Sequence, residues 1–230
     1  MKKIVLGLVG LVAVAILGVL VMAMMQPDHI HMERTVQIAA TAADMAPFAE
    51  DLKKVNEWSP WVGKDPNAAQ SYTENTTGVG ATYSWKGNDE VGEGNMAVKS
   101  AVPGKVVHHL TFIAPFQAEA DAAIAWEEAG DGVSVVWTYD DPAPTFMSKV
   151  MTVFVDMDTM LGPDYEKGLQ NLKPLVESAA AERMAAEKAA AEAAAAVPPN
   201  GGDVEGGEGV EGSEGAEPDE GAGEDDEAEE

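Results

Sequence analysis

The chain of 230 residues contains no cysteine. This absence excludes disulfide bonds, thiolate metal ligands and thiol catalysis. Positive charge is also scarce, because 14 Lys and Arg residues stand against 40 Asp and Glu residues, which gives a formal net charge of −26 at pH 7. A chain this acidic repels phosphate backbones, so the composition argues against nucleic acid as a partner.

Charged residues are missing from positions 4–25, an apolar run that follows Lys2 and Lys3. As a helix with a rise of about 1.5 Å per residue, this run is roughly 33 Å long, enough to cross a hydrocarbon core of ~30 Å. We therefore predict that residues 1–26 form a transmembrane anchor. One alternative is a cleaved secretory signal, although the run is longer than the usual ~7–15 apolar residues of such a signal. The other alternative is a buried helix of a soluble protein.

The charges beside this run predict its orientation. Lys2 and Lys3 precede it, and no Lys or Arg follows it before Arg34. By the positive-inside rule, the N-terminus stays in the cytoplasm and the rest of the chain lies on the extracytoplasmic, periplasmic side. The predicted localisation is therefore that of a single-pass membrane protein.

Basic and aromatic residues are absent from residues 201–230, which hold many of the acidic residues of the chain. Such a segment repels itself and buries little apolar surface, so we predict disorder over 197–230. This tail is interpreted as a solvated, solubilising segment, with weak binding of a basic partner or a divalent ion as the alternative. The preceding residues 179–196 are rich in alanine and lack a broad apolar face, which predicts an exposed helical extension.

Residues 28–178 have the size and apolar content of a single domain. Apolar residues alternate over 29–38, which predicts a strand. Helical spacing over 41–55, with Thr41 as the N-cap candidate, predicts that a helix pair follows this strand. Six alternating segments separated by Gly and Pro then predict an antiparallel meander. A long helical region follows over 147–176, with an interruption at 162–164 and a kink expected at Pro174.

Four segments of this domain carry a family resemblance: ERTVQIAATAADMAPFAEDLKKVNEWSPW, GVGATYSWKGNDEVGEGNMAV, LTFIAPFQAEADAAIAW and MDTMLGPDYEKGLQNLKPLVE. In this order they resemble the SRPBCC superfamily of START-like and Bet v 1-like proteins, especially its bacterial membrane-anchored, polyketide cyclase-like members. The resemblance covers roughly residues 28–177. It implies an α+β helix-grip fold, in which a seven-stranded antiparallel sheet wraps a long C-terminal helix around a cavity for an apolar ligand. It implies no particular reaction, because the superfamily includes both carriers and cyclases.

Large apolar side chains are the candidates for contacts with such a ligand, which we expect to be a lipid or another hydrophobic small molecule. The WSPW motif falls where the resemblance places one mouth of the cavity, and three further aromatic residues lie on predicted strands. The alternative is that these side chains fill an ordinary core. The candidate ligand-binding residues are Trp58, Trp61, Trp85, Phe112, Trp137, Met151 and Phe154.

Side chains suited to catalysis are few, and no cofactor is indicated. His108 and His109 are adjacent on a predicted strand, so one of them should face inward. They are weak candidates for the acid or base of a cyclase or hydrolase, and the alternative is a hydrogen-bonded structural role. His29 and His31 share a face but lack a third ligand, so no metal site is predicted. A further alternative is an interaction protein with a closed cavity, in which the acidic tail binds the partner.

Overall fold

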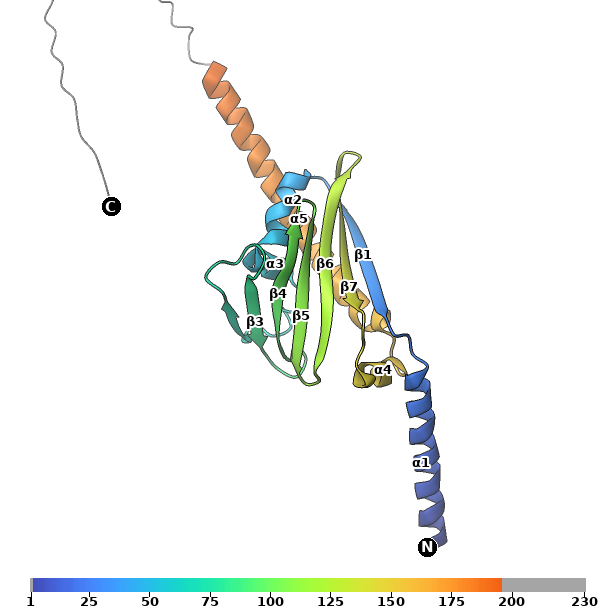
Figure 1. Cartoon of the computed structure of the whole chain (residues 1–230). Coiled ribbons are helices and arrows are strands. Elements are labelled where there is room, and N and C mark those ends of the chain that lie inside the picture. The colour runs from blue at the N-terminus through green and yellow to red at the C-terminus, as the bar shows by residue number, and fades with distance from the viewer. Residues whose placement is uncertain (1, 196–230) are drawn as a thin grey trace, which may run out of the picture. The chain divides into compact units, whose positions relative to one another are not determined.

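The computed structural model describes residues 2–195, so the acidic segment 197–230 lies outside the described residues. Figure 1 shows the order of the elements. They are α1 (Lys2–Met24), β1 (Ile30–Ile38), α2 (Ala42–Glu50), α3 (Leu52–Trp58), β2 (Ala69–Tyr72), β3 (Thr82–Lys86), β4 (Glu93–Val102), β5 (Lys105–Ala114), β6 (Ala118–Ala129), β7 (Gly132–Asp141), α4 (Phe146–Thr152) and α5 (Met157–Ala195).

The seven strands form one antiparallel sheet in the order β1-β7-β6-β5-β4-β3-β2. One face of the sheet packs against α5, whose buried residues Tyr165, Leu169 and Leu172 belong to the same apolar core as the strands. Because the sheet has one apolar face, a long amphipathic helix is needed to cover it. The predicted α+β helix-grip fold, with its seven strands and long C-terminal helix, is confirmed.

The helix pair expected in the region that begins at Thr41 consists of α2 and α3, which are separated at Asp51. Thr41 caps α2 as expected, in a capping box in which its side chain and that of Asp44 each accept a backbone N–H. Asp51 has an extended backbone and forms an isolated bridge with Thr77. Its carboxylate accepts the N–H of Lys53 at 2.9 Å and so caps α3. Asp51 therefore ends α2 and caps α3, while the apolar residues on both sides of it keep the spacing of a single helix.

The helical region predicted over 147–176 is also divided, which corrects the interpretation of its first half. α4 ends at Thr152, and α5 begins at Met157. The Asp156 carboxylate accepts the backbone N–H of Thr159 at 2.9 Å and its hydroxyl at 2.7 Å, which caps the start of α5. Met151 and Phe154 lie before this cap and are 46% and 68% exposed, so they do not extend the buried stripe of the long helix.

The interruption expected at residues 162–164 does not occur, because α5 contains both Pro163 and Pro174 as one continuous helix; the kink expected at Pro174 stays a prediction. Leu172 and Val176 flank Pro174 and are fully buried, so packing holds the helix on both sides of the missing N–H group. Gly162 lies directly against the Arg34 guanidinium. That guanidinium forms ion pairs of 2.7 Å with Asp158 and 2.9 Å with Glu166, which tie β1 to α5.

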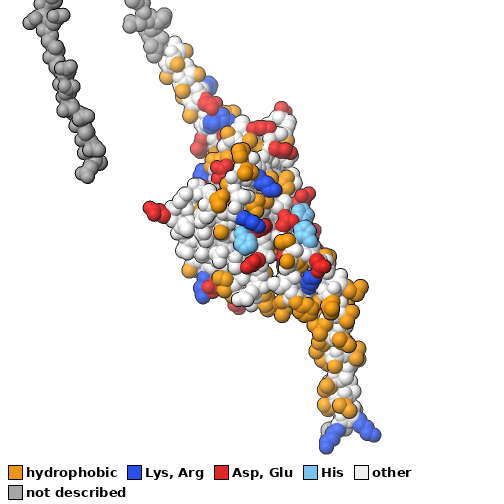
Figure 2. Space-filling view, in the orientation of Figure 1, with side chains coloured by type: hydrophobic (Ala, Val, Ile, Leu, Met, Phe, Trp, Pro, Cys, Tyr) orange, Lys and Arg blue, Asp and Glu red, His pale blue; other side chains and the backbone are white. Residues whose placement is uncertain are grey.

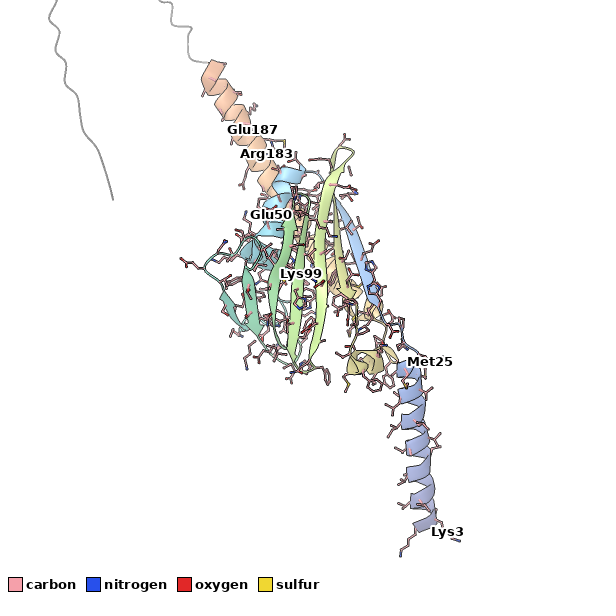
Figure 3. The ribbon with its side chains drawn as sticks, viewed as in Figure 1. Lys3, Met25, Glu50, Lys99, Arg183 and Glu187 are labelled. Carbon is pink, nitrogen blue, oxygen red and sulfur yellow. The ribbon has the colours of Figure 1, made fainter. Side chains whose placement is uncertain are left out.

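An ion pair joins the alanine-rich half of α5 to α2. Arg183 contacts both carboxylate oxygens of the buried Asp44 on α2, at 2.7 and 3.1 Å. This contact holds the pKa of Asp44 well below its usual range. Figure 3 shows Arg183 and Glu187 one turn apart on α5, and their side chains form an i,i+4 ion pair of 2.9 Å.

Gly168 allows α5 to approach the sheet closely. A Cβ at this position would lie 2.7 Å from the Trp137 ring and 3.2 Å from Cδ of Pro60. We expect Gly168→Val to lower the free energy of unfolding by about 2–3 kcal/mol, because the buried indole has no room to move. Denaturant unfolding followed by tryptophan fluorescence measures this change. Lys167→Ala, on the exposed neighbour, is the control and should shift stability by less than about 0.5 kcal/mol; an equal effect of both changes would contradict the packing argument.

Candidate functional site

The sheet face that packs against α5, here called the inner face, is defined by the strand register. On β5, residues Val106, His108, Leu110 and Phe112 lie on this face, since strand residues alternate between faces. His108 is paired with Val98 on β4 and with Ala122 on β6, and Ala122 is paired with Tyr139 on β7. One row across the middle of the sheet therefore contains an imidazole, a methyl group and a phenol.

Burial along the inner face falls from one end of the sheet to the other. Near the β6–β7 turn, Val106, Val133 and Val135 are fully buried. At the end of the sheet where β1 begins and β7 ends, Met32, Tyr139 and Asp141 are buried, whereas other inner-face side chains are only partly buried. These partly buried residues are Ile30, Trp85, Met96, Leu110 and Phe112. We call this region of the inner face the open end, because apolar surface remains accessible there.

An aromatic cluster fills the interior where α3, β7 and α5 meet. Trp137 stacks on Tyr165 with ring centroids 3.9 Å apart and meets Trp58 edge-on at 4.8 Å. Trp58 is fully buried, and its indole N–H donates to the carbonyl of Phe48 at 3.0 Å. Trp61 is partly exposed and contacts the same cluster edge-on, 5.8 Å from Trp137. Of the two tryptophans of the WSPW motif, one is thus core and the other lies at its margin.

A second aromatic group lies at the open end. The rings of Tyr83 and Trp85 stack at 5.7 Å, and Trp85 meets Phe112 edge-on at 6.1 Å. The Trp85 ring lies against the backbone of Gly94, where a Cβ would be 2.6 Å from the indole. The Trp85 N–H donates to the carbonyl of Val91 at 3.1 Å, so the ring is held in place at its polar edge. This group presents a fixed, half-buried aromatic surface.

His108 is a buried titratable side chain on the inner face, as is Asp141 at the end of β7. The His108 side chain is 1% exposed, and its Nε2 is the only buried side-chain nitrogen or oxygen among residues 2–195 without a hydrogen-bond partner. Burial lowers the pKa of His108 to about 4, so the imidazole is neutral at pH 7. Burial likewise raises the pKa of Tyr139 above its usual range. The neutral imidazole and the neutral phenol flank Ala122, whose small side chain occupies little space between them.

The other histidines lie outside this site. His109 faces the opposite side of the sheet, where it pairs with Asp121 at 2.9 Å, so of the two weak acid/base candidates only His108 is on the inner face. His31 contacts Asp140 at 2.7 Å, and this hydrogen bond raises the pKa of His31. Within the described part of the chain, no cluster of three or more His, Cys, Asp or Glu side chains is arranged to hold a metal ion.

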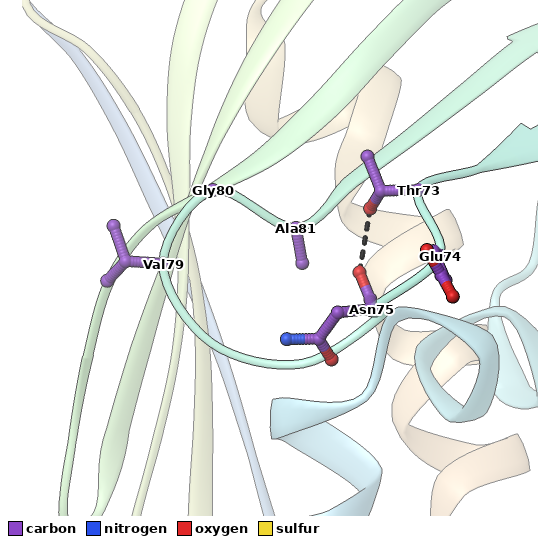
Figure 4. A pocket seen from close by; sticks show the side chains of 6 residues that line it. All are labelled: Thr73, Glu74, Asn75, Val79, Gly80 and Ala81. Atoms are coloured by element: carbon purple, nitrogen blue, oxygen red, sulfur yellow. Dashed lines mark hydrogen bonds between the residues drawn. The ribbon is translucent and has the colours of Figure 1, made fainter.

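Two surface depressions lie at the β2 edge of the sheet. The larger, of about 620 Å³, is formed by the loop between β2 and β3 (Figure 4) and is lined by Thr73, Glu74, Asn75, Val79, Gly80 and Ala81. Its polar side chains are satisfied locally, as in the 2.7 Å hydrogen bond from Thr73 to the carbonyl of Asn75. The smaller, of about 340 Å³, runs along β2, β3 and β4 and includes Trp85 and Gly94 in its lining.

The seven candidate ligand-binding residues thus fall into three separate places. Trp58, Trp61 and Trp137 belong to the aromatic cluster, Trp85 and Phe112 lie at the open end, and Met151 and Phe154 lie outside the core on and just after α4. Sequence reasoning missed the contributions of Tyr83, Met96 and Tyr139 to the inner face. Strand periodicity was the available signal, because residues two positions apart on a strand share a face. Tyr83, for example, stands two residues before the candidate Trp85.

The seven-stranded antiparallel sheet and the long helix that packs on its inner face define a helix-grip fold. The sequence matches no protein-family model and no curated protein. Among solved structures, it is similar to a protein from Chromobacterium violaceum, with 14% identity, a TM-score of 0.46 and coverage of 66% of this chain and 99% of that one.

Two further solved structures have a similar level of resemblance. The di-domain ARO/CYC StfQ of the steffimycin biosynthetic pathway has 11% identity and a TM-score of 0.47, over 68% of this chain and 52% of that chain. The major latex-like protein 151 of Panax ginseng has 9% identity and a TM-score of 0.43, over 67% and 99% of the two chains. Similarity at this level does not establish a shared ligand or activity.

Proposed function

We propose that the chain is a membrane-anchored domain that binds a lipid or another hydrophobic small molecule at the open end of its inner face. The observation that carries this proposal is the unpartnered Nε2 of His108, buried on the same face as the partly buried rings of Trp85 and Phe112. An apolar molecule with one hydrogen-bonding group would satisfy this nitrogen and cover these rings.

The energetics favour such a ligand. A buried polar atom without a partner costs about 1–3 kcal/mol, which a ligand's hydrogen bond would recover. Each Å² of apolar surface that the ligand removes from water contributes roughly 25 cal/mol before the costs of association. His108 and Tyr139 are neutral at pH 7, so an uncharged polar group on the ligand fits these two side chains better than a full charge does.

The anchor in this proposal is α1. Its 23 residues are long and apolar enough to cross a membrane, and its most apolar stretch is not buried against the domain. A helix of this composition gains nothing from exposure to water, which supports insertion into a bilayer. With Lys2 and Lys3 on the cytoplasmic side, the domain would lie on the extracytoplasmic side.

Analysis of molecules that copurify with the full chain tests the binding proposal. We expect native mass spectrometry and solvent extraction of the chain, purified from membranes in mild detergent, to detect about one hydrophobic molecule per chain. Trp85→Ala and Phe112→Ala should each raise the Kd for a fluorescent fatty acid roughly 5- to 30-fold and lower the occupancy after purification, because each removes an aromatic contact worth about 1–2 kcal/mol.

Val102→Ala is the matched control, because Val102 is exposed at the β4–β5 turn, away from the open end. It should leave the occupancy unchanged. The proposal fails if the wild-type chain carries no molecule above the detergent background and also shows no saturable binding of a fluorescent fatty acid.

A further inference from the structure

α4 and the residues that follow it expose an unusual amount of apolar surface. Six large apolar side chains between residues 146 and 160 are 45–68% exposed. They are Phe146, Met147, Met151, Phe154, Val155 and Met160. None of them belongs to the apolar core. A contiguous exposed surface of this kind marks a site of interaction with a protein or a membrane.

This surface adjoins the domain end of α1. α4 contacts α1 directly, and Lys149 of α4 forms an ion pair with Asp28, four residues after the end of α1. Ala23, in the last turn of α1, is fully buried. In Figure 3, Met25 marks this end of the helix and Lys3 the other. Figure 2 shows the hydrophobic side chains of α1 continuing onto the adjacent end of the domain.

The strand register places a second apolar segment at the same end of the sheet. The start of β1 pairs with the end of β7 through Ile30 and Asp141. The start of β6 pairs both with the end of β7 and with the end of β5. The β5–β6 turn, with Ile113 46% and Phe116 52% exposed, therefore lies at the end of the sheet from which α1 and α4 extend. This is also the open end of the inner face.

Charge decides which partner fits this surface. Residues 142–155 contain no Asp or Glu, although the chain has 40 of them, and their one cation, Lys149, is paired with Asp28. An apolar segment of this kind beside a membrane-spanning helix has the properties of an interfacial segment, which buries its apolar side chains about 5–10 Å into the headgroup boundary. A protein partner would have no comparable reason to lie next to the end of α1.

We propose that α4 and residues 153–155 insert into the interface of the bilayer that α1 spans, and that they hold the open end of the inner face against the lipid. This inference rests on the proposed function, because it requires α1 to be a membrane anchor. The inference adds to the proposed function a route for the ligand: the ligand moves directly between the bilayer and the inner face without crossing water. The expected ligand is therefore a molecule that is dissolved in the bilayer.

Site-directed fluorescence tests this placement, and the absence of cysteine in the chain makes single labels straightforward. Phe154→Cys and Met151→Cys would each carry an NBD label in the full chain, reconstituted into phosphatidylcholine vesicles. Asp131→Cys is the matched control, since Asp131 is exposed in the β6–β7 turn at the opposite end of the sheet and lies on the same side of the vesicle membrane. We expect doxyl-labelled lipids to quench the labels at 151 and 154 at least about threefold more than the label at 131.

The possible outcomes separate this inference from the anchor on which it rests. If the chain floats with the vesicles but the label at 154 is as accessible to aqueous iodide as the label at 131, the interfacial placement is wrong and the anchor stands. If the label at 154 is shielded from iodide without quenching by doxyl lipid, a protein surface such as a second copy covers α4, and the placement is again wrong. If the chain does not float with the vesicles, the anchor itself fails, and the inference fails with it.

Discussion

Replacing Trp137 with alanine is expected to lower the free energy of unfolding by about 3–5 kcal/mol, the usual cost of removing a fully packed indole. Trp137 is 5% exposed and contacts Trp58, Trp61 and Tyr165 at centroid distances of 3.9–5.8 Å. Because the backbone of α5 at Gly168 lies directly against this ring, the cavity left by its removal would be bounded in part by backbone that collapses poorly. Chemical denaturation of the full chain in detergent measures the loss.

Trp85→Ala is the matched comparison for this prediction. Trp85 is only partly buried and lies at the open end, so its removal should cost about 1–2 kcal/mol of stability. Its larger effect should be on ligand occupancy. Equal losses of stability in the two variants would show that the open end is as tightly packed as the aromatic cluster. That result would contradict the assignment of Trp137 to the core and of Trp85 to the ligand site.

Local patterns in the sequence were sufficient to predict the strands and the overall order of elements. β6 and β7 show the alternation between a more buried and a more solvated face clearly, and glycines or prolines separate the strands of the meander, so strand positions depend on neighbours within a few residues. The cap at Thr41 was predictable for the same reason, because its partner Asp44 is three residues away. The family resemblance then supplied the closing of the sheet around a helix.

The roles of individual aromatic residues were not predictable, because they depend on contacts between distant parts of the chain. Trp58 and Trp61 are three residues apart, yet one is fully buried against Trp137 and the other is partly exposed. The spacing of apolar residues also failed to separate α4 from α5. Met151, Phe154 and Met157 keep a helical interval across the break, and the interval cannot distinguish a side chain that faces the core from one that is exposed.

Acidification provides the sharpest test of His108, because its pKa of about 4 in the folded chain lies well below the value of about 6.5 in an unfolded chain. Between these values, the unfolded state binds a proton that the folded state excludes, so the stability supplied by the neutral imidazole is complete above pH 6.5 and is lost as the pH falls toward 4. The difference corresponds to about 3 kcal/mol, at about 1.4 kcal/mol per pH unit.

The measurement compares the pH dependence of unfolding in three chains between pH 7.5 and 4.5. The wild type should lose stability over this range, and His108→Leu should lose at least about 2 kcal/mol less, since an apolar side chain of similar size takes no proton. His109→Gln is the control, because His109 lies on the outer face beside Asp121 and should leave the slope due to His108 intact. Parallel slopes in the wild type and His108→Leu would mean that water or another group reaches Nε2, and the buried, unpartnered imidazole would no longer support a ligand site.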